Sequence, residues 1–326
     1  MSSNESPFPP VPEIREAVLS LLDGLNLYPD MAAVQLRTAL AGDYDVDFSQ
    51  IHVSTGASAV LADIVRATVN QGDEVVYAWR SFEAYPIIVQ AHGGVCVPVP
   101  LTDTYEHDLD AMAEAITDNT RLVLVCSPNN PTGSLIGTEV LRDFMTRVPD
   151  TVTVALDEAY TEFADADQRA DSAELFAEFS NLVRVRTFSK VHGIAGLRCG
   201  YAVAHPKLAA ALAKVTTPFG TNTLAQAAAL AARKPSAQEE FARRIAWIRS
   251  ERERVLAAAR EAGRTLPDSH GNFVYLPLGE RTAEFVQFAA DRGLITRGYG
   301  ADGVRITVGE EAANDLTIQI LSEFRK

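Results

Sequence analysis

Two ionisable residues, Asp157 and Lys190, follow apolar runs at positions where a charge is costly unless it has a partner or a task. Asp157 comes directly after VTVAL (152–156), so we expect its carboxyl group to be deeply placed and to need a cation. Lys190 lies in RTFSKVHGIAGLRCGY, and a lysine held near apolar walls or another cation has the lowered pKa that Schiff-base chemistry requires. Singly, each has a plainer interpretation as a helix-capping aspartate and a solvated surface lysine.

Groups that can bind a phosphate lie near Lys190 and in one earlier segment of the sequence. The hydroxyl and guanidinium groups beside the lysine belong to Thr187, Ser189 and Arg198. STGASAV (54–60) opens a helix with small residues, whose backbone amides can cradle an anion. The segment matches neither the dinucleotide fingerprint G-x-G-x-x-G nor the phosphate loop of nucleotide hydrolases, which argues against a nicotinamide oxidoreductase.

Two more polar residues occupy informative positions. Asn130 lies in SPNNPTG (127–133), a rigid turn that directly follows an apolar run and can aim the amide into a crevice. Arg305 lies inside the apolar strand-like segment GVRITVG, where a guanidinium needs an anionic partner. A substrate carboxylate and a structural salt bridge are both consistent with that position.

The elements that must position these residues alternate along most of the chain. Short apolar runs occupy residues 74–78, 95–99, 121–126, 152–156, 182–186 and 199–204. Helix-length stretches such as 58–70 and 109–116 lie between them, which predicts an α/β fold with a mostly parallel sheet sandwiched by helices. Ligands of such sheets bind beyond the carboxyl ends of the strands, which is where Asp157, Asn130 and Lys190 fall.

The pattern changes near residue 235. A long helical pattern runs to residue 262, and short strand candidates follow at 272–276, 294–297 and 304–308. This predicts a smaller α+β lobe, on which we expect the helix near 11–22 to pack. We therefore expect a large domain at 24–240 and a small domain made of 1–23 plus 241–326.

Composition excludes several classes of function. The chain has 326 residues, with 29 Lys plus Arg against 43 Asp plus Glu and a net charge of −14, so nucleic acids and anionic membranes are poor partners. The three cysteines show no C-x-x-C spacing, which argues against a disulfide framework or a cysteine metal site and for a reducing compartment. The first ten residues lack a secretory signal, and we expect a cytoplasmic protein without a bound metal.

In this order and spacing the motifs resemble those of the fold type I pyridoxal-phosphate aminotransferases, close to their histidinol-phosphate and aromatic aminotransferase branch. The matching segments are SSNESPF, NLYPD, AWRSFEAYP, SPNNPTG, DEAY, SKVHGIAGLRCGY and GVRITVG. The resemblance covers the whole chain. It implies pyridoxal 5'-phosphate as the cofactor and a homodimer with active sites at the interface between the subunits.

The resemblance also implies roles for single residues. Lys190 would bind the cofactor covalently and then move a proton between the substrate Cα and the cofactor. Asp157 would pair with the pyridine nitrogen, Asn130 and Tyr160 would hold the phenolate oxygen, and Phe82 would stack on the ring. The phosphate would be bound by Ala57, Ser58, Thr187, Ser189, Arg198 and the partner subunit's Tyr28.

The substrate is less constrained by the sequence. Arg305 matches the arginine that binds the substrate α-carboxylate, and we expect Arg297 and Asn272 to bind the substrate as well. Because Arg297 could add a second cation, the arginines fit both an aromatic amino acid and histidinol phosphate. The segments AWRSFEAYP and RGYGADGVRITVG favour a phenylalanine- or tyrosine-type donor, with a 2-oxo acid such as 2-oxoglutarate as acceptor. Histidinol-phosphate transamination is the alternative, and a pyridoxal-phosphate lyase is a further one.

Two features depart from the family pattern. Met1 falls where these chains are usually some way in, so an N-terminal arm that would cover the active site is absent from the sequence; we expect either that the start is miscalled or that the cleft is more open. His192 stands where a tyrosine is usual. It is either a packing substitute or a titrating imidazole that shifts the pH optimum.

Overall fold

A seven-stranded sheet and a three-stranded sheet organise residues 1–324, the part of the chain that the computed structural model describes. The larger sheet has the order β1 (Ile51–Ser54), β7 (Gly200–Val203), β6 (Leu182–Thr187), β5 (Thr153–Asp157), β4 (Thr120–Cys126), β2 (Glu74–Trp79) and β3 (Val95–Pro100). The strands from β3 to β6 are parallel, whereas β7 runs antiparallel to both of its neighbours. The predicted mostly parallel sheet is confirmed, and β1 is a strand that the sequence analysis did not single out.

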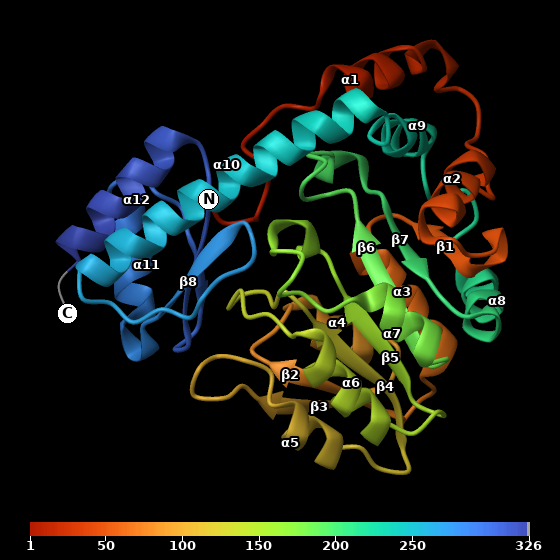
Figure 1. The fold of residues 1–326 in the computed structure, drawn as a ribbon, viewed down its shortest axis with the longest axis horizontal. Coiled ribbons are helices and arrows are strands. Elements are labelled where there is room, and N and C mark those ends of the chain that lie inside the picture. The colour runs from red at the N-terminus through yellow and green to blue at the C-terminus, as the bar shows by residue number, and fades with distance from the viewer. Residues whose placement is uncertain (325–326) are drawn as a thin grey trace.

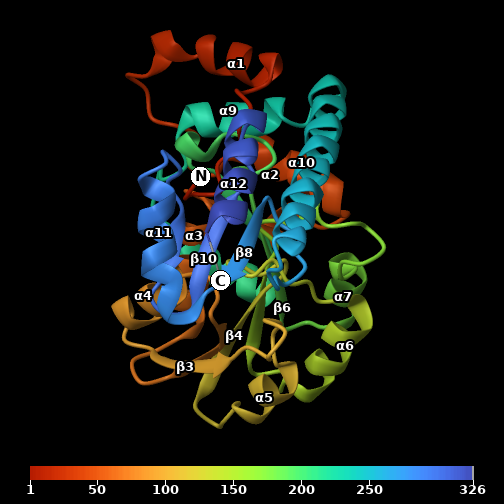
Figure 2. The ribbon, with the colours of Figure 1, turned by 90° about the vertical axis from the view of Figure 1, so that its left-hand side faces the viewer.

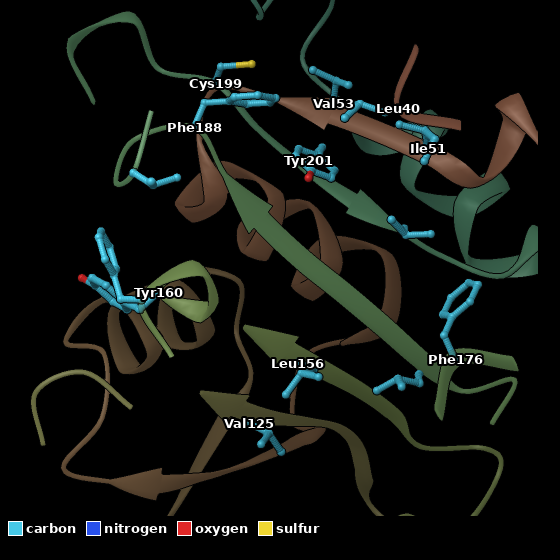
Figure 3. Close-up of a cluster of buried hydrophobic side chains, with 14 of the residues drawn as sticks. Leu40, Ile51, Val53, Val125, Leu156, Tyr160, Phe176, Phe188, Cys199 and Tyr201 are labelled. Atoms are coloured by element: carbon cyan, nitrogen blue, oxygen red, sulfur yellow. The ribbon is translucent and has the colours of Figure 1, made fainter. Parts of the chain in front are cut away.

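Both faces of this sheet are buried, because its strands carry apolar side chains at successive positions. In β4, Leu122 and Leu124 pack on one face, and Val123 and Val125 pack on the other. The first face is covered by α3 (Ala57–Thr68), α4 (Ala84–Ala91) and α8 (Pro206–Val215). The second core includes side chains of α2 (Val34–Tyr44), α5 (Leu109–Glu114), α6 (Thr138–Arg147), α7 (Ser172–Glu178) and α9 (Thr223–Ala231). Figure 3 shows part of this second core, with Tyr160 at its edge.

The smaller lobe lies beside the large sheet and is joined to it by one long helix (Figures 1 and 2). Its antiparallel sheet has the order β8 (Phe273–Pro277), β10 (Gly303–Thr307) and β9 (Arg297–Tyr299), and it packs with α11 (Thr282–Ala290) and α12 (Glu311–Glu323). The long helix is α10 (Pro235–Glu261), which confirms the predicted helical stretch. Within residues 1–324, none of the helices combines the length and the apolar character that crossing a membrane requires.

One strand of the small lobe is displaced from its predicted position. The sequence analysis placed it at 294–297, but β9 begins only at Arg297. Leu294 is instead buried in the core of the small lobe, directly after the turn that ends α11. Pairing with β10 starts at Arg297, which lies opposite Arg305, and ends at Tyr299.

The first helix does not pack as expected. α1 (Pro12–Leu19) lies against α9 rather than on the small lobe, and in Figure 1 it stands at the far end of α10. Val11 and Ile14 are buried in the same core as the alanines of α9, whose small side chains let the two helices approach closely. The prediction for this helix is therefore wrong. α10 runs through the predicted domain boundary at 240/241, and the division into domains stays a prediction.

Candidate active site

A cavity of about 260 Å³ opens at the carboxyl ends of the parallel strands, where polar residues follow the buried apolar runs. Ten residues that the sequence analysis singled out line it together: Ala57, Ser58, Phe82, Asn130, Asp157, Tyr160, Thr187, Ser189, Lys190 and Arg198. The first and the last of them, Ala57 and Arg198, are about 140 residues apart in the sequence. The fold thus gathers into one space the groups whose sequence neighbourhoods suggested chemistry.

Asp157 is the last residue of β5 and is only 3% exposed. Burial raises the pKa of its carboxyl group to about 6. Two hydrogen bonds oppose this shift, since the Tyr85 hydroxyl donates to Oδ2 at 3.0 Å and the Ala159 amide donates to Oδ1 at 3.1 Å. These donors fix the carboxyl group but bring no positive charge. The Lys190 charge also lowers the pKa, but within residues 1–324 no cation lies at ion-pair distance from the Asp157 carboxyl group.

Lys190 is held in the same cavity by backbone oxygens. Its Nζ donates to the carbonyls of Asn4 at 3.1 Å and Ser3 at 3.4 Å, and lies 5.2 Å from the centre of the Tyr160 ring. Burial and, to a smaller extent, the Arg305 guanidinium together lower the pKa of the amine to about 8. A substantial part of the Lys190 amine is consequently neutral, and so nucleophilic, near pH 8.

The end of the cavity beside α3 is built to receive an anion. Gly56, with a φ of 91°, precedes the helix, and no side chain caps its first turn. A Cβ atom on Gly56 would come within 2.6 Å of the Arg198 guanidinium, so only glycine allows this approach. The helix N-terminus, the guanidinium and the hydroxyls of Ser58, Thr187 and Ser189 therefore face one cavity.

Gly200 allows the start of β7, which follows Arg198, to lie against the N-terminus of α3. A Cβ atom there would lie 2.4 Å from the Ala57 amide nitrogen and 2.5 Å from the Gly56 carbonyl carbon. The start of β7 can approach α3 this closely because residue 200 has no side chain.

Hydrogen bonds of the preceding residue, Asn129, hold the turn that carries Asn130. Asn129 accepts a hydrogen bond from the Ser81 hydroxyl at 2.7 Å and donates to the Arg80 carbonyl at 3.1 Å. Asn130 is thereby left to face the cavity, where its Oδ1 accepts from the Arg305 guanidinium. The Tyr160 hydroxyl accepts from Asn4 Nδ2 at 2.9 Å, and burial raises its pKa to about 12.

Residues 2–5 lie across the substrate side of the cavity. The Ser2 carbonyl accepts from Arg305, and Ser3 and Glu5 form part of the cavity wall. Asn4 is fully buried and exchanges hydrogen bonds with Thr307 of β10. Residues 2–5 thus wall this side of the cavity, and a cleft more open than is usual in the family stays a prediction.

The residues predicted to bind substrate do not line this cavity themselves. Arg305 is buried behind Asn130, and its Nε lacks a partner among the described residues. Asn272 is also buried, with its Nδ2 donating to the Asn4 carbonyl at 3.3 Å. Arg297 is instead exposed and paired with Glu83. Tyr28 is 83% exposed and contacts Phe219 with the two rings tilted by 39° and their centres 4.9 Å apart.

His192 proves to be a packing residue. Its ring lies 4.8 Å from that of Phe188 and 5.1 Å from that of Phe241, measured between ring centres. Burial lowers the pKa of the imidazole to about 4, so the ring is neutral near pH 7. Of the two roles left open for this residue, the structure favours packing.

Several residues of the site were not singled out from the sequence. They are Ser3, Asn4, Glu5, Tyr85, Cys126, Ala159 and Ala195. Tyr85 lies in AWRSFEAYP, and residues 3–5 lie in SSNESPF. Their place in these two family-like segments is the sequence feature that could have identified them as site residues. Burial raises the pKa of the Cys126 thiol, which makes it a wall of the cavity rather than a nucleophile.

Known proteins resemble the chain over its whole length. It matches the family model for aminotransferase class I and II over residues 1–321. It is 47% identical over 326 residues to an aromatic amino acid aminotransferase of Streptomyces avermitilis, covering 100% of this chain and 90% of that protein. The identity to the aromatic amino acid aminotransferase of Rhodococcus erythropolis is 48% over 315 residues, or 97% of this chain and 87% of the relative.

A solved structure shares the fold. The histidinol-phosphate aminotransferase of Sinorhizobium meliloti, in complex with pyridoxal-5'-phosphate, is similar with a TM-score of 0.89 and 30% identity. The match covers 99% of this chain and 89% of that one.

Proposed function

The chain belongs to the class I and II aminotransferase family, and we propose that it moves the amino group of an aromatic amino acid to a 2-oxo acid. Pyridoxal 5'-phosphate is the cofactor that goes with this family. One observation carries the proposal: a buried amine, a buried carboxyl group and an anion cradle share a single cavity beside a buried arginine.

The donor set of the cavity fits the cofactor. The aldehyde needs an amine, the ring nitrogen needs an acid and the phosphate needs a cradle, and these are Lys190, Asp157 and the end of the cavity at α3. When bound, the cofactor supplies a protonated ring that stabilises negative charge at the substrate Cα. The Asp157 carboxyl group is the strongest sign of this fit, because it is buried without an ion-pair partner among residues 1–324 and a cationic ring nitrogen would offset its burial.

The chain's own residues would then do the remaining work. Asp157 would hold the proton on the ring nitrogen, and Tyr160 and Asn130 would bond to the phenolate oxygen. Lys190, once its amine is released, would accept the proton from the substrate Cα and return it to the carbon of the cofactor aldehyde. Arg305 would bind the α-carboxylate, which would replace the Ser2 carbonyl as its partner.

The face of the small sheet that carries Arg305 supports an aromatic substrate. Tyr275 and Arg297 lie directly opposite Arg305 in the neighbouring strands, so their side chains share that face. The Arg305 guanidinium carbon lies 5.7 Å from the centre of the Phe273 ring and 5.9 Å from that of Tyr299. A carboxylate-binding guanidinium surrounded by rings suits a substrate with a carboxylate and an aromatic side chain.

Phenylalanine is therefore expected to be a better donor than histidinol phosphate. With 2-oxoglutarate as acceptor, we expect kcat/KM for phenylalanine to exceed that for histidinol phosphate by about tenfold or more, because a buried arginine and apolar rings match the former. Parallel assays of the two donors on one preparation measure this. A clear preference for histidinol phosphate would assign the chain to the alternative function.

The pH dependence of cofactor uptake tests the role of Lys190. Only the neutral amine reacts with an aldehyde, so uptake by cofactor-free protein rises with pH until the amine is deprotonated. With a pKa of about 8, the rate is expected to rise about tenfold between pH 7 and pH 9, whereas an ordinary lysine would give a rise of about a hundredfold. Stopped-flow absorbance measures this rate, and the reaction of Nα-acetyl-lysine corrects for titration of the cofactor. A hundredfold rise would contradict the assignment.

The proposal includes a homodimer in the cytoplasm. Exposed apolar side chains gather around Tyr28, and they belong to Leu22, Leu25, Leu27, Met31, Val34 and Phe219. Apolar side chains exposed close together in this way are typical of an interface between proteins. Across such an interface the partner subunit's Tyr28 would complete the phosphate site. The three free cysteines are consistent with a reducing compartment.

A further inference from the structure

Two ion pairs connect the large and small lobes at the edge of the site. Arg297 of β9 donates to both carboxylate oxygens of Glu83, from NH2 at 2.9 Å and from Nε at 3.1 Å. Arg80 makes the second pair with Asp302 in the turn between β9 and β10, with its Nε at 2.7 Å from the carboxylate. The sequence separations are 214 and 222 residues, so both pairs are products of the tertiary fold.

The first pair lies on the face of the small sheet that carries Arg305. Arg297 lies directly opposite Arg305 across the β9–β10 ladder, so both guanidinium groups project from the same face of the sheet. Glu83 directly follows Phe82, which lines the cavity. Tyr299, two residues after Arg297 in β9, has its ring centre 5.9 Å from the Arg305 guanidinium carbon, so the pair lies near the carboxylate-binding arginine. Asp302, in contrast, lies in the turn beyond β9.

This geometry determines what Arg297 can offer a ligand. A fork-shaped pair with a carboxylate uses the donors that would otherwise hold a phosphate. A phosphate monoester carries a charge of about −1.5 to −2 near pH 7. It would have to displace Glu83, which would then remain beside it as an unpaired negative charge, whereas a neutral ring meets no such repulsion.

We propose that Glu83 determines the donor preference of this site by occupying Arg297 and placing a negative charge where a substrate phosphate would lie. The inference rests on the proposed function, since it explains a preference for aromatic over phosphorylated donors. Both partners are partly exposed, so the pair contributes little to the free energy of unfolding. Its effect is on selectivity: the residue excludes one substrate class and does not take part in the reaction.

The variant Glu83→Gln tests this with the holoenzyme. The second-order rate constant of the donor half-reaction, followed by cofactor absorbance, is measured with phenylalanine and with histidinol phosphate. This design leaves the oxo-acid acceptor out of the comparison. For each enzyme, the rate constant with histidinol phosphate is divided by that with phenylalanine. We expect this ratio to be about tenfold or more higher in the variant than in the unsubstituted enzyme. An unchanged ratio would overturn the proposal.

Two further variants separate charge from loosening of the lobes. The double variant Arg80→Gln/Asp302→Asn removes the other interlobe pair without releasing a charge and leaves Glu83 on Arg297, so its ratio should stay within about twofold of the original. Adding Arg297→Gln to Glu83→Gln should cancel the gain, because the released guanidinium is then absent. An equal rise in Arg80→Gln/Asp302→Asn, or a gain that survives the loss of Arg297, would contradict the inference. A preference of the unsubstituted enzyme for histidinol phosphate would count against the proposed function instead, whatever the variants show.

Discussion

Replacing Lys190 with alanine is expected to lower kcat for transamination by a factor on the order of 10⁴ or more. Lys190 has two tasks in the proposed reaction, since it binds the cofactor aldehyde and then moves the proton at the substrate Cα. A positioned acid–base group alone contributes about 10²- to 10⁴-fold to a rate. Effects of a residue that serves several steps are not additive, so the loss should reach the upper end of that range or exceed it.

Two further substitutions test whether the loss of activity is due to the amine of Lys190. Lys190→Arg keeps the positive charge but cannot release a neutral amine, so it should be as inactive as the alanine variant. Lys207→Ala removes an exposed lysine of α8 and should leave activity unchanged. Borohydride reduction followed by peptide mapping gives an independent readout, with the label expected on the peptide that contains Lys190. A label on another lysine, or an active Lys190→Ala enzyme, would overturn the assignment.

The sequence predicted those site residues whose positions are determined by the end of a strand. Asp157 and Thr187 are the last residues of parallel strands, and Asn130 follows the end of another. Because parallel strands present their carboxyl ends at one edge, a residue that follows an apolar run is placed by local sequence alone. The same logic located the small residues of 54–60 at a helix N-terminus.

Contacts between distant segments were not accessible in this way. The hydrogen bond from Tyr85 to Asp157 spans 72 residues, and that from Asn4 to Tyr160 spans 156. Neither is implied by apolar periodicity, which indicates the face of a helix or strand but not which residue lies across from it. The misplaced first helix has the same origin, since α1 could bury its apolar face against either lobe, and tertiary packing decided the outcome.

Arg297 shows why counting charged residues could not assign the substrate. From sequence it is a second cation near Arg305, and so a candidate for a phosphate. In the fold its donors are already used by Glu83, which lies 214 residues earlier in the chain. The charge that a substrate meets therefore depends on a pairing that only the tertiary structure determines.

Replacing Asp157 with asparagine is expected to lower kcat by about 10²- to 10⁴-fold while the protein still takes up the cofactor. Asparagine can still accept the Tyr85 hydrogen bond, but it carries no negative charge to keep the ring nitrogen protonated. Removing one partner of a buried charge pair costs about 3–5 kcal/mol, which corresponds to this range of rates. Cofactor uptake should persist, because Lys190 and the anion cradle at α3 are untouched.

Steady-state kinetics and cofactor absorbance separate these effects. Asp157→Glu restores the charge on a longer side chain and should recover part of the lost rate, since the buried site has little room for an extra methylene group. Tyr85→Phe removes a donor to the carboxylate without changing its charge, so its effect should be far smaller than that of Asp157→Asn. An Asp157→Asn enzyme within about threefold of the original rate would show that the carboxylate does not act on the ring, because a buried charge lost beside a reacting group cannot be that small an effect.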